Sequence, residues 1–232
     1  MLNAHSVPLD PLLAGFFSIK DATKLIGATN AAKVRGWLNG WNGNTSGPVI
    51  DRDFFGTNTI SFLDLMELRF IEFFRGQGVS MQTLRRAAER ARKDWGTGHP
   101  FALSNAKYMT DRRAVIAQAA DDTGDKVTWD LASGQIQMWE VIEGAIAKGV
   151  VFDPQTDFAV RWHPEPEASP NIVIDPHFAF GKPIVEAVNI PTIALFNQWK
   201  AEQGDFDRVA NWFDIKTEEV LAAVNYEIRM AA

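Results

Sequence analysis

The chain is organised around residues 17 to 41, which read FSIKDATKLIGATNAAKVRGWLNGW. This pattern predicts a helix-turn-helix. Ser18 is placed to cap a first helix, and Asp21 stands three residues later, where a capping box carries an acid. Gly27 ends that helix. A second helix begins from Thr29 or Asn30, both good caps, and carries the apolar stripe Ala31, Val34, Trp37 and Leu38.

The opposite face of the second helix is expected to point outward with Ala32 and Gly36, flanked by Lys33 and Arg35. Small residues between two cations suit a helix that lies close against an anionic surface, and the major groove of DNA is the usual place for such a helix. The alternative is an ordinary helical hairpin with a solvated basic face.

The same stretch resembles the first helix-turn-helix of MerR-like winged-helix proteins. The matching residues are Phe17, Ser18, Ile19, Asp21, Ala22, Leu25, Gly27, Arg35 and Trp37. The spacing from Gly27 to Trp37 is one residue longer than in that family. The resemblance implies DNA binding by the second helix, with Asn30, Lys33 and Arg35 as the candidate contacts.

Composition indicates a folded protein with room for two compact domains: 232 residues, 46% of them hydrophobic, with eight Trp and sixteen Phe. The start of the chain has no basic segment followed by an apolar core, and no run reaches the length of a membrane span, so we expect a cytoplasmic protein that does not enter a membrane. The absence of Cys excludes disulfides and thiolate zinc sites. The four His lack ligand spacing, so no metal site and no cofactor is predicted.

The net charge of -6 is unevenly distributed. Residues 1–100 hold 12 Lys and Arg against 9 Asp and Glu, whereas the rest of the chain is acidic. Any DNA contact is therefore expected in the N-terminal part, and the acidic remainder should face another kind of partner.

Residues 39–60 have the Gly, Asn and Thr content of a hairpin wing, with short extended pieces at 48–50 and 57–60. Arg52 lies between these pieces and is a candidate phosphate or minor-groove contact; the alternative is a solvated loop arginine.

Two strong helices are expected next. Ser61 caps a helix that runs to Arg75 and is apolar almost all round, which indicates either a dimer contact or a central core helix. Ser80 opens the second, which is basic and carries Arg85 and Arg86 as candidate phosphate contacts; a solvated face is the alternative.

Residues 101–163 are expected to form a small β-rich middle segment. Residues 127–131 alternate as a strand, residues 135–148 are compatible with either strand or helix, and 149–153 with 158–162 read as a hairpin. The proline-rich stretch 163–170 is expected to be a linker.

Beyond it, two short extended pieces precede three helices, expected at 192–202, 205–213 and 217–226. The predicted fold class is therefore α+β: a winged helix-turn-helix over 1–100, the β-rich segment over 101–163 and a helix-turn-helix-like trihelical domain over 164–232.

Residues 170–227 resemble the small domain called domain-of-unknown-function family 433. The segments that carry this match are Ile174-Asp175-Pro176, Phe180-Gly181-Lys182-Pro183, Ile190-Pro191-Thr192 and Glu219-Val220. The whole chain is similar to longer members of that family, which share the motifs Trp37-Leu38-Asn39-Gly40-Trp41, Ser61 to Arg69 and Gly78-Val79-Ser80. Those members resemble VapB-type antitoxins. This resemblance implies an antitoxin that binds its own promoter as a homodimer and holds a PIN-like ribonuclease toxin.

The alternatives to this function are a regulator without a toxin and an enzyme. A MerR-like regulator without a toxin would use Trp129, Trp139 and Trp162 to line a ligand pocket, although aromatic residues at such spacing are more often core. An enzyme is not expected, because there is no phosphate-binding loop and no nucleophile elbow. His99 and His163 each precede a proline and are expected at the surface rather than as catalytic bases.

Overall fold

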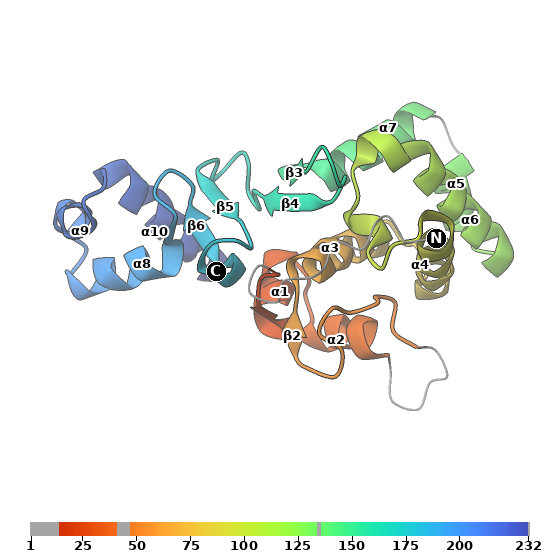
Figure 1. Ribbon diagram of the computed structural model, residues 1–232, viewed down its shortest axis with the longest axis horizontal. Coiled ribbons are helices and arrows are strands. Elements are labelled where there is room, and N and C mark those ends of the chain that lie inside the picture. The colour runs from red at the N-terminus through yellow and green to blue at the C-terminus, as the bar shows by residue number, and fades with distance from the viewer. Residues whose placement is uncertain (1–13, 41–46, 134–135, 232) are drawn as a thin grey trace. The chain divides into compact units, whose positions relative to one another are not determined.

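The computed structural model describes residues 14–40, 47–133 and 136–231, which fold into two compact units (Figure 1). The first unit consists mainly of Phe17–Lys148, and the second consists mainly of Val160–Ala232. Helices and two small sheets are both present, so the expected mixed α+β class is confirmed at this level.

The first unit is mostly helical. Its elements in chain order are β1 (Phe17–Ser18), α1 (Ile19–Leu25), α2 (Ala31–Asn39), β2 (Thr59–Ile60), α3 (Phe62–Gly76), α4 (Met81–Trp95), the short 3-10 helix η2 (Pro100–Ala102), α5 (Asn105–Thr123), α6 (Lys126–Ser133) and α7 (Ile136–Ala147). The expected domain boundary near residue 100 does not separate these elements, since residues 101–148 belong to the same unit as α1–α4.

Four of these helices begin where the sequence places a cap. The Ser18 side chain accepts a hydrogen bond from the backbone N–H of Asp21, and Asn30 accepts one from Ala32. Ser61 and Ser80 cap α3 and α4 in the same way. Each cap satisfies a backbone donor that has no partner inside the helix, so the first turn forms from short-range interactions alone.

Helix α3 is a central core helix of its own unit. Phe70 stacks on Phe101 with ring centroids 4.0 Å apart, and Phe74 packs near Trp139. Burial on several sides explains why the sequence of α3 is apolar almost all round. Two acidic residues of this helix, Asp64 and Glu67, are buried as well.

The expected strand at 127–131 is wrong, since these residues lie in α6. Asp125 precedes the helix, and its side-chain carboxylate accepts a hydrogen bond from the backbone N–H of Thr128. Thr128 and Ala132, four residues apart, are buried, while Val127 and Trp129 are exposed. A helical cap and a helical burial period therefore override the local alternation, and the middle segment is helical through α5–α7 rather than β-rich.

The expected wing hairpin also differs from the structure. Strand β2 pairs antiparallel with β1, with Phe17 opposite Ile60, rather than with residues 48–50. Val49 instead donates its backbone N–H to the carbonyl of Trp37 at the end of α2, and its side chain is buried. Residues 41–46, which the wing prediction also included, lie outside the described residues.

The second unit contains a small sheet and three helices (Figure 1). The sheet has the order β3-β4-β5-β6-β7. Its elements are β3 (Val150–Phe152), β4 (Ala159–Trp162), β5 (Ile172–Ile174), the 3-10 helix η3 (Ala179–Gly181), β6 (Pro183–Val185), β7 (Ile190–Pro191), α8 (Thr192–Ala201), α9 (Phe206–Phe213) and α10 (Thr217–Ala231). The three expected C-terminal helices are confirmed, with α10 longer than expected.

One hydrophobic core joins the sheet of this unit to its helices. Ile172 and Val185 from neighbouring strands share it with Leu195, Val209 and Val220, one from each helix. The stretch expected as a linker is tied to this unit, because Arg229 of α10 donates to the Glu165 carboxylate at 3.0 Å.

Candidate nucleic-acid interface

Helix α2 presents one short basic face to solvent. Val34, Trp37 and Leu38 are buried, as their helical spacing predicted, and Lys33 and Arg35 are exposed. Gly36 is buried rather than outward-facing, so the expectation for that residue is wrong. The exposed face is therefore centred on the first two turns of the helix.

Lys33 and Arg35 form no ion pair with any other residue that the structure describes. Their charges are thus available to an external anion. Asn30 has a different role, because its Oδ1 accepts the Ala32 backbone N–H at 2.8 Å and caps the helix. Its position still brings it to the exposed start of α2.

Arg52 does not belong to an exposed basic surface. Its side chain is buried, and its guanidinium donates to Asn39 Oδ1 at 2.7 Å and to the Thr59 carbonyl at 2.6 Å. These bonds join the end of α2 to β2. Arg52 is therefore buried and bonded inside the protein, rather than exposed as a phosphate contact or as a solvated loop arginine.

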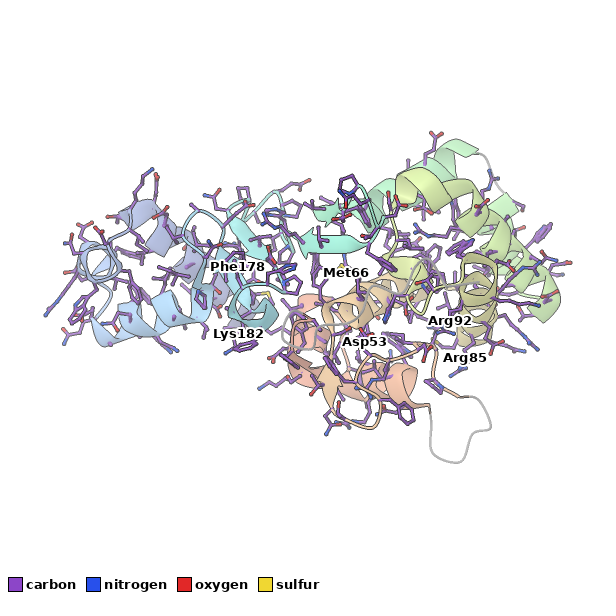
Figure 2. The ribbon with its side chains drawn as sticks, in the orientation of Figure 1. Asp53, Met66, Arg85, Arg92, Phe178 and Lys182 are labelled. Carbon is purple, nitrogen blue, oxygen red and sulfur yellow. The ribbon has the colours of Figure 1, made fainter. Side chains whose placement is uncertain are left out.

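Two of the five cations on α4, Arg85 and Arg92, bond to backbone carbonyls of another segment; Figure 2 labels both. Arg85 donates from Nε to the Gly47 carbonyl at 3.0 Å, and Arg92 donates to the Val49 carbonyl. Arg86 is exposed and lies 3.6 Å from Glu89 in a surface ion pair. Of the two candidates on this helix, Arg86 is the more available to a phosphate, while Arg85 supports the segment that follows α2.

Phe55 is a surface residue that sequence reasoning missed. It lies in the turn between Arg52 and β2 and exposes 85% of its side chain. Arg52 anchors this turn to α2 at Asn39. The only sequence signal was an aromatic pair directly before Gly56, in a stretch otherwise typical of a turn.

Sequence reasoning also missed a buried ionisable cluster in the first unit, formed by Asp53, Asp64, Glu67 and His99. The expectation that His99 lies at the surface is wrong. Its Nε2 lies 3.0 Å from Asp53 Oδ1. Asp64 and Glu67 follow the i, i+3 spacing of one helix face, but His99 is distant in sequence, so no local pattern predicts the group.

Burial and mutual charge shift the proton affinities in this cluster. Burial by itself lowers the pKa of His99, but its contacts with Asp53 and Glu67 outweigh burial and raise that pKa to about 10. Burial raises the pKa of Asp64 to about 6, against the opposing charge of His99. The His99 imidazole is therefore protonated at neutral pH, and its positive charge faces three carboxyl groups.

Two of the three tryptophans considered for a ligand pocket, Trp139 and Trp162, are buried, and Trp129 is 44% exposed on α6. Trp139 packs against Phe74 in the core of the first unit. Trp139 therefore corresponds to the core interpretation of these aromatic residues.

The second unit combines acidic and apolar residues at its surface. Trp212 on α9 exposes 68% of its side chain, and Leu221 and Ile228 on α10 are also exposed. Asp207 and Glu218, at the starts of the same two helices, are exposed acids. Large apolar side chains exposed in this way are candidate contacts for a partner.

Comparisons with known proteins define the fold and leave the activity open. No family model and no curated protein matches the chain. Within the described residues, no helix is both long and apolar enough to cross a bilayer. Among solved structures, the crystal structure of Rv2018 from Mycobacterium tuberculosis is similar, with a TM-score of 0.65 and 20% identity over 90% of this chain and 96% of that one. The chain therefore shares its fold along nearly its full length with Rv2018.

Proposed function

We propose that this protein is a DNA-binding, antitoxin-like transcriptional regulator that acts on its own promoter. The observation that carries the proposal is the exposed basic face of α2, where Lys33 and Arg35 have no ionic partner among the described residues. In this proposal α1 and α2 form a helix-turn-helix within the first unit, and α2 is the helix that enters the major groove.

The chemistry of α2 supports this placement. Ala32 beside Lys33 is small and exposed, which allows close approach to base edges. Lys33 and Arg35 are able to donate to guanine O6 and N7 or to phosphate oxygens. Asn30 contributes at the start of the helix, where backbone N–H groups and the helix dipole favour an anion.

Other parts of the first unit add affinity in this proposal. Arg86 on α4 contacts a phosphate, since its surface pair with Glu89 is weak and easily exchanged. Phe55, held in a turn anchored by Arg52, packs against sugars at the edge of the groove. Arg85 and Arg92 act indirectly by supporting residues 47–49.

The partner of the second unit is proposed to be a PIN-like toxin. This part rests on the resemblance to VapB-type antitoxins. The exposed Trp212, Leu221 and Ile228, interspersed with acidic residues, support a protein contact. A homodimer is proposed because DNA-binding domains of this kind read two half-sites through two-fold symmetry.

The DNA proposal is tested by replacing Lys33 and Arg35 together with Ala. We expect affinity for the promoter fragment to fall about 100-fold or more, because each groove contact contributes about 1–3 kcal/mol of discrimination. The slope of log affinity against log salt concentration should become less steep by about one for each replaced cation that contacts a DNA phosphate. Fluorescence anisotropy with promoter and scrambled DNA measures both quantities.

The matched control replaces Lys126 and Lys182 with Ala. Both are exposed and form no ion pair with a described residue, so this variant loses the same two charges away from α2. Equal losses in the two variants would mean that only overall charge matters, and would contradict the placement of α2 in the groove.

The partner proposal is tested separately by co-expressing the tagged chain with the untagged product of the neighbouring gene. A stable complex of a small PIN-like protein with paired copies of this chain supports the antitoxin function. A homodimer that binds the promoter but not the product of the neighbouring gene supports the alternative, a MerR-like ligand-responsive regulator without a toxin.

A further inference from the structure

The buried cluster in the first unit has a composition that points to a missing ligand. Asp53 precedes β2, Asp64 and Glu67 lie one turn apart on α3, and His99 directly precedes η2. Their side chains are only 15%, 0%, 1% and 9% exposed, respectively. Three separate segments therefore bring four ionisable side chains together where little solvent reaches them. Figure 2 labels one of the four, Asp53.

Most hydrogen-bonding atoms of this cluster have protein partners. Asp53 accepts from Ser61 Oγ, and Asp64 Oδ2 accepts the Ser61 backbone N–H at 3.1 Å. Glu67 Oε1 accepts the Phe101 backbone N–H at 3.1 Å. Within the cluster, two buried atoms have no hydrogen-bond partner among the described residues: Asp64 Oδ1 and His99 Nδ1. Such groups cost about 1–3 kcal/mol each when they stay unsatisfied.

The two unsatisfied atoms face each other. His99 Nδ1 lies 3.9 Å from Asp64 Oδ1 and 3.7 Å from Glu67 Oε2. These distances are too long for hydrogen bonds. They are close to the separation of about 3.4 Å expected between two ligands that share a tetrahedral ion with bonds of about 2.1 Å. Each of the two pairs that include His99 Nδ1 is therefore within about 0.5 Å of the separation expected for two ligands of one ion.

Asp53 prepares His99 for this role. In the neutral imidazole with the proton on Nε2, His99 donates to Asp53 Oδ1 at 3.0 Å and directs the lone pair of Nδ1 at Asp64 and Glu67. Metal-binding histidines almost always donate their second ring N–H to a carboxylate or carbonyl in this way. Ser61 Oγ in turn holds Asp53.

The charge of the cluster also favours a cation. Three carboxyl groups surround one imidazole, and no Lys or Arg among the described residues forms an ion pair with them. A protonated imidazole compensates one negative charge, whereas a divalent ion beside a neutral imidazole compensates two. One nitrogen with carboxylate oxygens suits first-row transition metals better than Ca²⁺ or Mg²⁺, which prefer oxygen ligands alone.

We propose that His99 Nδ1, Asp64 Oδ1 and Glu67 Oε2 bind one divalent transition-metal ion, such as Zn²⁺ or Mn²⁺, with Asp53 as the residue that positions His99. The bound ion ties the start of α3 to the segment after α4, and the turn before β2 is joined to it through Asp53, which bonds to His99. The site shares no residue with the DNA and toxin contacts proposed above.

The test uses the full chain after treatment with a chelator, with Zn²⁺ and then Mn²⁺ as probes. Calorimetric titration and metal analysis of the desalted protein should give one ion per chain and a higher melting temperature, with no such effect from Mg²⁺. Glu67→Gln and His99→Gln should lose more than about 100-fold in affinity, and Asp53→Asn about 10–100-fold.

Glu72→Gln is the matched control, because Glu72 lies on the same helix outside the cluster. Its affinity should equal that of the unmodified chain. Glu67→Gln is the decisive variant if His99→Gln does not fold, since a Gln side chain still accepts the Phe101 N–H. The absence of a stoichiometric ion in the unmodified chain, or unchanged affinity in Glu67→Gln, overturns the proposal.

Discussion

Arg112 and Glu143 join α5 to α7 through a buried ion pair of one cation and one anion, whereas the junction around His99 gathers three carboxyl groups about one imidazole. The Arg112 Nη1 to Glu143 Oε2 distance is 2.7 Å, and the two side chains are 0% and 3% exposed. Arg112 also donates to the Leu103 carbonyl at 3.1 Å. The first arrangement is balanced and serves packing. The second carries excess negative charge, and for this reason we assign it a ligand.

The largest expected effect comes from breaking the balanced pair. Glu143→Ala leaves the buried Arg112 guanidinium without its anion and should reduce the free energy of unfolding by about 3–5 kcal/mol. Denaturation with urea, followed by circular dichroism, measures the loss. Replacing both residues, Arg112→Met with Glu143→Leu, should recover most of it, since no uncompensated charge remains.

Glu140→Ala provides the control for this experiment. Glu140 lies one turn earlier on α7 and is exposed, so its removal should change stability by less than about 0.5 kcal/mol. A loss below about 1 kcal/mol in Glu143→Ala would mean that the pair is not a structural link, and the comparison would fail.

A second prediction concerns Asp125, which links the starts of α4 and α6. Its carboxylate accepts from the Ser80 N–H at 3.1 Å, from Thr83 Oγ1 at 2.8 Å, and from both the backbone and the hydroxyl of Thr128. Asp125→Ala should cost about 2 kcal/mol, because it removes the cap of α6 and the hydrogen bonds from Ser80 and Thr83 at the start of α4. Exposed Asp122 is the control.

The hydrogen bonds to Asp125 also predict how the stability of the protein changes with pH. Burial alone raises the pKa of Asp125, but hydrogen bonds from Thr83, Thr128 and Ser80 outweigh it and hold that pKa well below its usual range. A carboxyl group with a depressed folded-state pKa stabilises fully above its unfolded pKa of about 4, and that contribution is lost as the pH falls further. Asp125→Asn should flatten this acid-dependent part of the stability curve; an unchanged curve would contradict the assignment.

The smallest effect is expected in the unbalanced cluster. In chelator-treated protein, Glu67→Gln should change the free energy of unfolding by less than about 1 kcal/mol, because it removes one of three crowded anions and keeps the acceptor for Phe101 N–H. The same denaturation assay compares it directly with Glu143→Ala. A loss as large as that of Glu143→Ala would show that the cluster is a balanced network after all.

Helices α2 and α4 show a similar difference between charges that have partners in the protein and charges that do not. Helix α4 carries more cations than α2, yet Arg85 and Arg92 are used for carbonyls of residues 47–49. Helix α2 carries only two cations, Lys33 and Arg35, and neither forms an ion pair with a residue that the structure describes. The number of charges on a helix therefore does not identify a binding face, and the partners of each charge must be known.

Sequence reasoning succeeded where the deciding interaction is local. The caps Ser18, Asn30, Ser61 and Ser80 each bond a backbone N–H two or three residues away. It failed at residues 127–131, where a strand-like alternation was overridden by packing against neighbouring helices. It also failed at Arg52, whose partners lie 13 and 7 residues away.

The amino-acid sequence by itself determined where most helices begin, which face of α2 is apolar, and that the basic charge lies in the N-terminal part. Those features depend on side chains within one or two helical turns. Only the tertiary structure decided that His99 is buried beside Asp53, Asp64 and Glu67, and that Arg52 faces inward. Such groups meet through chain closure over tens of residues, where the packing of whole helices, rather than any local preference, sets which side chains share a site.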